Sequence, residues 1–148
     1  MRLLVHYAVL LFASSVLSCM GSISGDIGVR NGRLSPCPDS PNCVSSQTND
    51  NRQYIAPLRY SSTEEEAKDR LLGVLKAMKR TEIVTDRGDY IHAECTSAVF
   101  HFVDDAEFLF DDSSKTIEMR SAARLGYYDF GVNRRRLEAV GAAFTGQK

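Results

Sequence analysis

The sequence predicts an α+β domain, an antiparallel sheet of about four to five strands with one helix before it and one after it, packed on one face. Apolar residues recur at helical spacing in residues 61–80 and 132–144, whereas apolar and polar residues alternate in the segments between. Turn-forming stretches join the alternating segments, which favours neighbouring antiparallel strands. Helices that flank such a sheet bury their apolar stripes against it, which gives two layers.

The first helix is expected over residues 61–80. At its start Ser62 and Thr63 are followed three positions later by Glu65 and Glu66, the pattern of a capping box. Its apolar stripe consists of Ala67, Leu71, Leu75 and Met78. The last helix, residues 132–144, repeats this spacing with Leu137, Val140 and Phe144 turned inward.

The strands are predicted from a period of two. They are residues 81–85, 90–96, 98–103 and 116–122, and residues 107–110 extend the third of them after an acidic break. In the second strand Ile91, Ala93 and Cys95 share one face, and His92 and Glu94 share the other. Residues 34–60 hold all four prolines and are expected to be irregular chain on the surface.

The N-terminus has the layout of an exported protein. A basic Arg2, an apolar run over residues 3–17 and small residues before a cysteine form a secretory signal. The residues V-L-S-C resemble a bacterial lipobox, so residues 1–18 are expected to be removed and Cys19 to be lipidated. A plain signal cut near Ser18 and a short buried helix are the alternatives. Residues 19–33, rich in Gly and Ser, are expected to be a flexible tether before a single domain at 34–145.

Three cysteines remain after Cys19. Disulfides persist in the compartments that exported proteins reach, and the stretch between Cys37 and Cys43 is turn-forming and proline-rich. A Cys37–Cys43 disulfide is therefore expected, with free thiols, pairing to Cys95, or a metal site as alternatives. Structural zinc sites use tighter cysteine pairs and two further ligands, which disfavours the metal. Cys95 by default is a buried free thiol.

Charge and hydropathy argue against two kinds of protein, a general nucleic-acid binder and a protein that spans a membrane. The chain has 148 residues and a formal net charge of -1, which argues against a general nucleic-acid binder. No segment reaches the roughly 18 consecutive apolar residues of a membrane-spanning helix. The expected membrane contact is therefore the lipid on Cys19, and no cofactor or resident metal is expected.

One polar cluster surrounds the entry to the last helix. Arginine side chains form forked contacts to carboxylates and phosphates, and helix N-terminal amides favour anions. A site for an anionic or lipidic ligand, or for an envelope protein, is therefore expected at Arg120, Arg124, Tyr127, Asp129, Asn133, Arg134 and Arg136. The alternative is internal, with these arginines paired to Asp104, Asp105, Glu107 and Asp129.

A second cluster is acidic and lies on the predicted strands. His92, Glu94, Asp104, Asp105 and Glu107 are of the types that supply acid–base catalysis or bind a divalent cation. They carry the alternative of a hydrolase-like or metal-assisted enzyme. The tripeptide H-A-E at 92–94 also occurs in zinc deaminases, but no P-C-x-x-C follows it here, so that class is rejected.

Several motifs in order resemble one known family. They are C-P-D-S-P-N-C-V-S-S at 37–46, Y-I-H-A-E at 90–94, F-V-D-D-A-E-F at 102–108, R-S-A-A-R-L-G-Y at 120–127 and D-F-G-V-N-R-R-R at 129–136. Together they resemble the family called domain of unknown function 1499 (DUF1499), over about residues 34–141. The resemblance implies a bacterial or plastid protein that is exported or membrane-associated. It implies no activity and no catalytic residue.

The expected function is that of a non-enzymatic lipoprotein of the bacterial cell envelope, facing the periplasm or otherwise outside the cytoplasm. It would bind an anionic or lipidic ligand or a protein partner, or serve a structural role. The enzyme that uses the strand-borne acids is the alternative.

Overall fold

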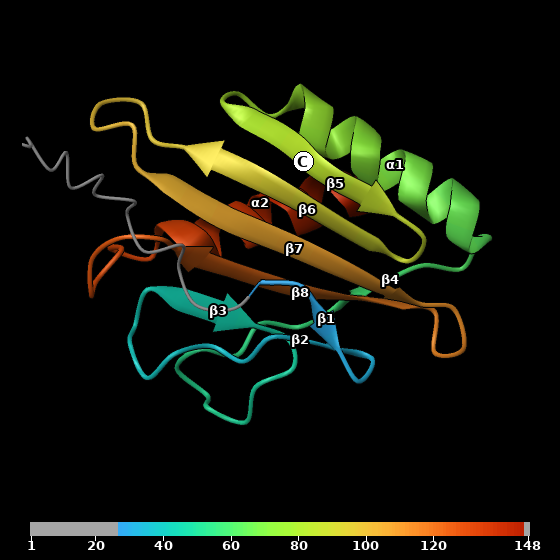
Figure 1. The fold of residues 1–148 in the computed structure, drawn as a ribbon. Helices are drawn as coiled ribbons and strands as arrows, with labels where there is room; N and C mark the ends of the chain where they lie inside the picture. Colours follow the sequence, from blue (N-terminus) through green and yellow to red (C-terminus); the bar gives the residue numbers. More distant parts are fainter. Residues whose placement is uncertain (1–26, 147–148) are drawn as a thin grey trace, which may run out of the picture.

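The computed structural model describes residues 27–146, which form two layers (Figure 1). Six strands form one antiparallel sheet in the order β3-β8-β7-β6-β5, with β4 also paired to β8. They are β3 (Cys43–Ser45), β4 (Leu58–Arg59), β5 (Thr81–Arg87), β6 (Tyr90–Thr96), β7 (Val103–Asp111) and β8 (Thr116–Ala123). A separate hairpin joins β1 (Val29–Arg30) to β2 (Arg33–Leu34). The predicted α+β class is confirmed.

Both helices lie on the same face of the sheet (Figure 1). They are α1 (Glu64–Ala77), which precedes β5, and α2 (Val132–Thr145), which follows β8. The capping box of α1 forms between Thr63 and Glu66, as its sequence predicts. Within residues 27–146, neither helix combines the length and the apolar content that crossing a bilayer requires.

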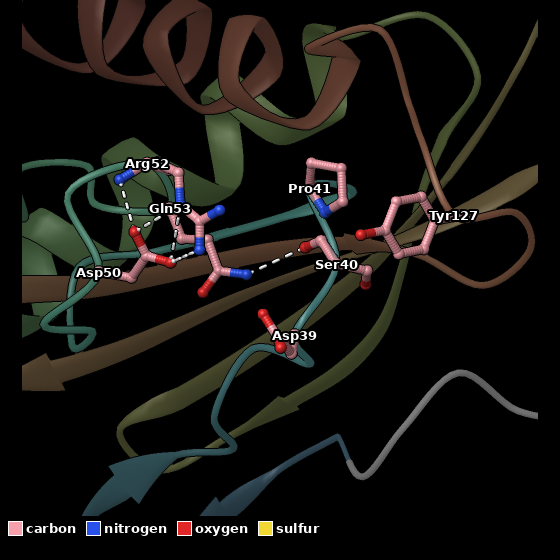
Figure 2. Close-up of a pocket in the computed structure, with 7 residues that line it drawn as sticks. All are labelled: Asp39, Ser40, Pro41, Asp50, Arg52, Gln53 and Tyr127. Atoms are coloured by element: carbon pink, nitrogen blue, oxygen red, sulfur yellow. Dashed lines mark hydrogen bonds and ion pairs between the residues drawn. The ribbon is translucent and has the colours of Figure 1, made fainter.

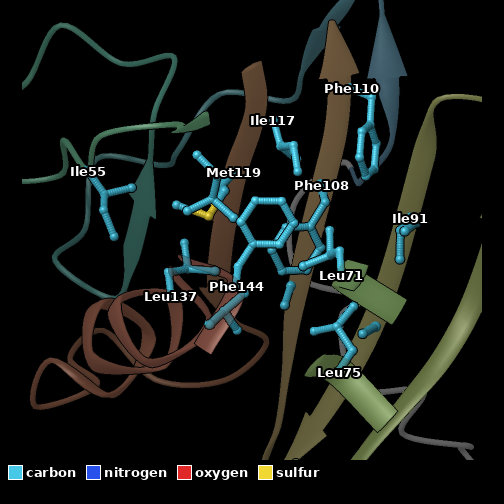
Figure 3. Packing of buried hydrophobic residues seen from close by; sticks show 14 of the residues in the cluster. Ile55, Leu71, Leu75, Ile91, Phe108, Phe110, Ile117, Met119, Leu137 and Phe144 are labelled. Carbon is cyan, nitrogen blue, oxygen red and sulfur yellow. The ribbon is translucent and has the colours of Figure 1, made fainter. Parts of the chain in front are cut away.

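The core lies between the helices and the sheet (Figure 3). The predicted stripe of α1 is buried except for Met78, which packs partly against the core. Residues that alternate along the strands complete it, among them Ile91, Ala93, Cys95, Ala106, Phe108, Phe110, Ile117 and Met119. Complete burial of a large apolar side chain contributes about 1.5–3 kcal/mol, so these layers supply the main stabilisation of the domain.

Strand β7 differs from its prediction. It runs unbroken from Val103 to Asp111, whereas residues 97–102 form a turn instead of a strand. The predicted acidic break does not occur because its two carboxylates have arginine partners on opposite faces, Arg136 for Asp104 and Arg124 for Asp105. A charged side chain inside a sheet is tolerated when it is paired in this way.

The segment before α1 is more regular than expected. Strands β3 and β4 pair with β8, and the β1–β2 hairpin contacts β7 and β8. The Cys37–Cys43 disulfide is present, and Cys95 is a buried free cysteine. Burial raises the pKa of the Cys95 thiol, which makes it a poor nucleophile.

The predicted signal and Cys19 lie outside the described residues. The described chain joins the domain almost at once, because the backbone N–H of Gly28 donates to Glu107 Oε1 at 2.6 Å and β1 starts at Val29. Residues 28–33, which the sequence assigned to the tether, therefore belong to the folded unit.

Candidate functional site

The face of the sheet opposite the helices carries a row of polar side chains from neighbouring strands. Side chains alternate along a strand, so the neighbours of the core residues on β6, β7 and β8 point to this face. We call this row the polar ladder. It comprises Tyr90, His92, Glu94, Asp105, Glu107, Arg120 and Arg124.

Glu107 is the centre of the buried half of the ladder. Its Oε2 accepts from Arg120 Nη1 at 2.6 Å, and its Oε1 accepts from Tyr90 Oη at 2.8 Å and from the N–H of Gly28. Glu107 is 0% and Arg120 1% exposed. Among the described residues, Arg120 Nε is the buried side-chain atom that has no hydrogen-bond partner. The two charges compensate each other away from water, so each depends on the other.

Asp105 is the centre of the half-open part. Arg124 donates to both of its oxygens through Nε and Nη2, and His92 Nε2 lies 2.8 Å from Oδ1. Arg124 Nη2 also donates to Glu94. Hydrogen bonding to Asp105, and then to Glu94, raises the pKa of the Arg124 guanidinium above its usual value. This half of the ladder opens toward solvent where Glu94 and Arg124 are partly exposed.

A metal could be considered at this half-open part. His92, Glu94 and Asp105 each offer a ligand atom, and these atoms lie within 4.8 Å of one another. One imidazole and two carboxylates fit zinc or a similar divalent cation. The guanidinium of Arg124 already holds both carboxylates, however, and it would repel a cation placed between them.

A second polar cluster lies on the helix face, at the start of α2. Arg136 donates to Asp104 Oδ2 at 2.6 Å and also to Asn133 Oδ1. Asn133 accepts from Ser121 Oγ at 2.6 Å and donates to the carbonyl of Asn42 at 3.1 Å. Burial raises the pKa of Asp104 against the lowering effect of Arg136. This cluster ties α2, β8 and the disulfide loop together.

One partly open pocket beside the disulfide loop is small. It has a volume of about 110 Å³ and lies between the disulfide loop and residues 50–53 (Figure 2). Its lining residues are Asp39, Ser40, Pro41, Asp50, Arg52, Gln53 and Tyr127. Gln53 Nε2 donates to the carbonyls of Pro38 and Ser40, which fixes the wall, and Asp50 is paired with Arg52. A space of this size holds a few waters rather than a ligand of drug size.

The structure distributes the seven predicted ligand residues over four places. Arg120 and Arg124 belong to the polar ladder, and Asp129, Asn133 and Arg136 belong to the cluster at α2. Arg134 donates to the backbone carbonyls of Arg52 and Tyr54, and Tyr127 lines the cavity. These contacts are mainly of the internal kind that the sequence left as the alternative.

The five predicted acidic-site residues divide between the two faces. His92, Glu94, Asp105 and Glu107 lie together on the open face, whereas Asp104 lies on the helix face. All five have partners in the fold: Asp104 is engaged by Arg136 and Glu107 by Arg120. Arg124 engages Glu94 and Asp105, and His92 lies against Asp105.

Sequence reasoning missed one group of residues as a surface, although it placed one member, Tyr127, in the predicted ligand site. We call this group the aromatic end, and it consists of Val99, Phe100, Phe102, Leu125, Tyr127, Tyr128 and Phe130, all exposed. The run A-V-F-H-F was interpreted as a strand because its residue types favour strands. The density of aromatic residues in the predicted loop 123–131 was the signal that could have revealed this surface, because loops are normally polar.

The protein is a two-layer α+β domain. The polar side chains on the face of its sheet opposite the helices are paired with one another. Residues 33–144 match the family model described as protein of unknown function (DUF1499), and the chain belongs to this family. Neither the curated proteins nor the solved structures compared with it gave a match. The family assignment confirms the resemblance found in the sequence motifs.

Tyr90 provides a test of the buried half of the ladder. Burial, followed by the charge of Glu107, raises the pKa of the Tyr90 phenol above its usual value of about 10. A raised pKa in the folded state means that this hydrogen bond stabilises the protein fully below pH ~10 and is lost as the pH rises further. The substitution Tyr90→Phe is therefore expected to flatten the decrease in unfolding free energy above about pH 10, measured by urea titration between about pH 9 and pH 12. An unchanged pH dependence would contradict the assignment.

Proposed function

We propose that the protein is a lipid-anchored module of the bacterial cell envelope that acts by binding or bracing rather than by catalysis. The observation that carries the proposal is the pairing within the polar ladder. Its carboxylates, arginines and histidine are engaged with one another, and the most buried of them, Glu107 and Arg120, are almost inaccessible to solvent. A general base or nucleophile must instead reach a substrate within hydrogen-bond distance.

The location in the envelope is supported by two features. The N-terminal sequence has the layout of a secretory signal that ends in a lipobox-like cysteine, Cys19. The Cys37–Cys43 disulfide is of the kind that persists in oxidising compartments such as the periplasm. Several acyl chains on one cysteine would hold the domain stably at a membrane without a spanning helix.

The anchor is tested by labelling cells with radioactive or alkyne-tagged palmitate. The wild-type chain is expected to carry label and to fractionate with membranes, whereas Cys19→Ala is expected to carry none. Cys95→Ala serves as the matched control, because Cys95 is buried and should not affect labelling. Absence of label on the wild-type chain would overturn the proposed anchor.

The second candidate is a metal-assisted enzyme at His92, Glu94 and Asp105. The proximity of their three ligand atoms favours it, and the position of Arg124 opposes it. The metal content of the purified full chain decides between the binding proposal and the metal-assisted enzyme. A stoichiometric metal that is lost in His92→Ala would replace the binding proposal with the enzyme.

A further inference from the structure

Exposed apolar side chains are concentrated at one end of the molecule. Of the eleven large apolar residues exposed in residues 27–146, seven form the aromatic end. They come from loops 97–102 and 124–131, which extend from the same end of the sheet because β6 ends, β7 begins and β8 ends there (Figure 1). The N–H of Arg124 donates to the carbonyl of Val103, which joins the two loops at their base. Exposed apolar patches of this kind mark interaction surfaces.

The loops hold these side chains away from the core. Phe100 stacks on Phe102 at a centroid distance of 5.6 Å, and Tyr128 packs edge-on against Phe130 at 5.0 Å. Phe100 and Phe130 remain 73% and 77% exposed. Each loop also contains a non-glycine residue in the left-handed region, His101 at φ 54° and Phe130 at φ 55°. Such a conformation is uncommon and persists only where the surrounding structure imposes it.

Hydrogen bonds make both loops well defined. Ser97 and Phe102 exchange two of them, from Ser97 N to the carbonyl of Phe102 and from Phe102 N to Ser97 Oγ. The second loop is held by Asn42, whose Nδ2 donates to the carbonyl of Gly126 at 2.5 Å. Through this hydrogen bond the disulfide loop, which contains Asn42, stabilises loop 124–131 of the aromatic end. A surface that is already ordered loses little conformational entropy on binding.

The charges of the two loops fit a lipid interface. Loop 97–102 has no acidic residue, and the single acid of loop 124–131, Asp129, accepts hydrogen bonds from the backbone N–H of Gly131 and from Asn133. Arg135 is exposed just behind the loops, at the start of α2. Aromatic side chains with basic residues behind them are typical of protein surfaces that sit in the headgroup region of a bilayer.

The predicted anchor can reach the same bilayer. Ile27 lies eight positions after Cys19, and an extended chain over eight positions spans about 28 Å. Gly28 is bonded to Glu107, four residues along β7 from Val103, which places it about 14 Å from the aromatic end. The tether is therefore long enough to pass the end of the sheet, and short enough to keep the domain beside the membrane.

From these observations we infer that the aromatic end docks on a phospholipid bilayer, with loops 97–102 and 124–131 inserted into the interface. This inference rests on the proposed function, since the lipid on Cys19 supplies the first attachment and the loops supply the second. The acyl chains on Cys19 would hold the domain at the membrane, and the loops would add a second contact that fixes its orientation. The docked domain would stand with its sheet directed away from the membrane.

The test exploits the absence of tryptophan from the sequence. Phe100→Trp places a single fluorophore in the aromatic end, and Val84→Trp places one on the exposed side of β5 as the matched control. The full chains are mixed with vesicles of phosphatidylethanolamine and phosphatidylglycerol that contain brominated acyl chains. Strong quenching and a blue shift are expected for Phe100→Trp and neither for Val84→Trp. Equal quenching of the two reporters, or none, would overturn the docking.

A pair of exposed-site variants measures the strength of the contact. In the Cys19→Ala full chain, Phe100→Ser with Phe130→Ser is expected to lower vesicle partitioning about 100-fold, since each buried phenylalanine contributes about ten-fold or more. Tyr54→Ser with Val84→Ser should leave it unchanged, and circular dichroism verifies that all variants fold. A dimer in solution that the Phe100→Ser and Phe130→Ser changes dissociate, without any vesicle binding, would assign the surface to a second copy and overturn the inference.

The outcomes separate this inference from the proposed anchor. Palmitate labelling that persists while Phe100→Trp is not quenched overturns the docking alone. Quenching that persists when the wild-type chain carries no label supports the docking surface and overturns the anchor alone.

Discussion

Arg120→Met is expected to lower the free energy of unfolding by about 3–5 kcal/mol. The substitution leaves Glu107 charged, almost completely buried, and without its ion partner at 2.6 Å. Tyr90 and the N–H of Gly28 still donate to that carboxylate, but neither carries a positive charge. Urea denaturation at neutral pH, followed by circular dichroism, measures the change.

Two further variants make this result specific to the buried pair. Replacing both partners, Glu107→Leu with Arg120→Met, is expected to restore at least half of the loss, because no isolated charge remains. The exposed pair Asp50 and Arg52 provides the matched control, and Arg52→Met should lower the free energy of unfolding far less than Arg120→Met does. Equal losses of unfolding free energy for Arg120→Met and Arg52→Met would show that Glu107 does not depend on the charge of Arg120.

The local elements of this fold could be predicted because their signals are local. At the start of α1 the N-cap Thr63 and Glu66 exchange side-chain to backbone hydrogen bonds within four residues. Strand β6 was predicted at its observed bounds from simple alternation. The helices cover one face as expected, since their apolar stripes have nowhere else to be buried. Sequence patterns of short range are therefore sufficient for the two-layer class.

The unbroken course of β7 could not be predicted. The sequence offers pairing of its carboxylates with arginines as an alternative, but these partners lie far along the chain. Asp104 is paired across 32 residues with Arg136, and Asp105 across 19 residues with Arg124. Nothing near Asp104 in the sequence indicates such a partner, so two adjacent acids predict a break in the strand. The same long-range pairing places five of the seven residues of the predicted ligand site in the polar ladder and in the cluster at α2.

The aromatic end was missed for the opposite reason. Phe100 and Phe102 alternate with other residues as a strand would, but the turn at residues 97–102 removes them from the sheet. The sequence predicted a strand over residues 98–103, whereas residues 97–102 form a turn whose aromatic side chains are exposed. Sites of this kind, where local preference and the fold disagree, are where function is expected.

Asn133→Ala is expected to lower the free energy of unfolding by about 2–4 kcal/mol, the second largest effect that the fold predicts. Asn133 is completely buried, and its amide joins Ser121, Arg136 and the carbonyl of Asn42. Its removal leaves several buried polar groups without partners. Alanine favours the helix slightly more than asparagine does, which offsets only about 0.5 kcal/mol. Chemical denaturation measures the loss.

The position of Asn133 gives this prediction a second readout. Because its amide holds the carbonyl of Asn42, and Asn42 in turn holds Gly126, the substitution should release the disulfide loop and the aromatic end together. Hydrogen exchange is expected to accelerate in residues 37–43 and 124–131 while the core strands β6 and β7 stay protected. Glu138→Ala, an exposed change on the same helix, should alter neither stability nor exchange by a measurable amount. Faster exchange confined to α2 would show that Asn133 stabilises its own helix and that the aromatic end is braced by other contacts.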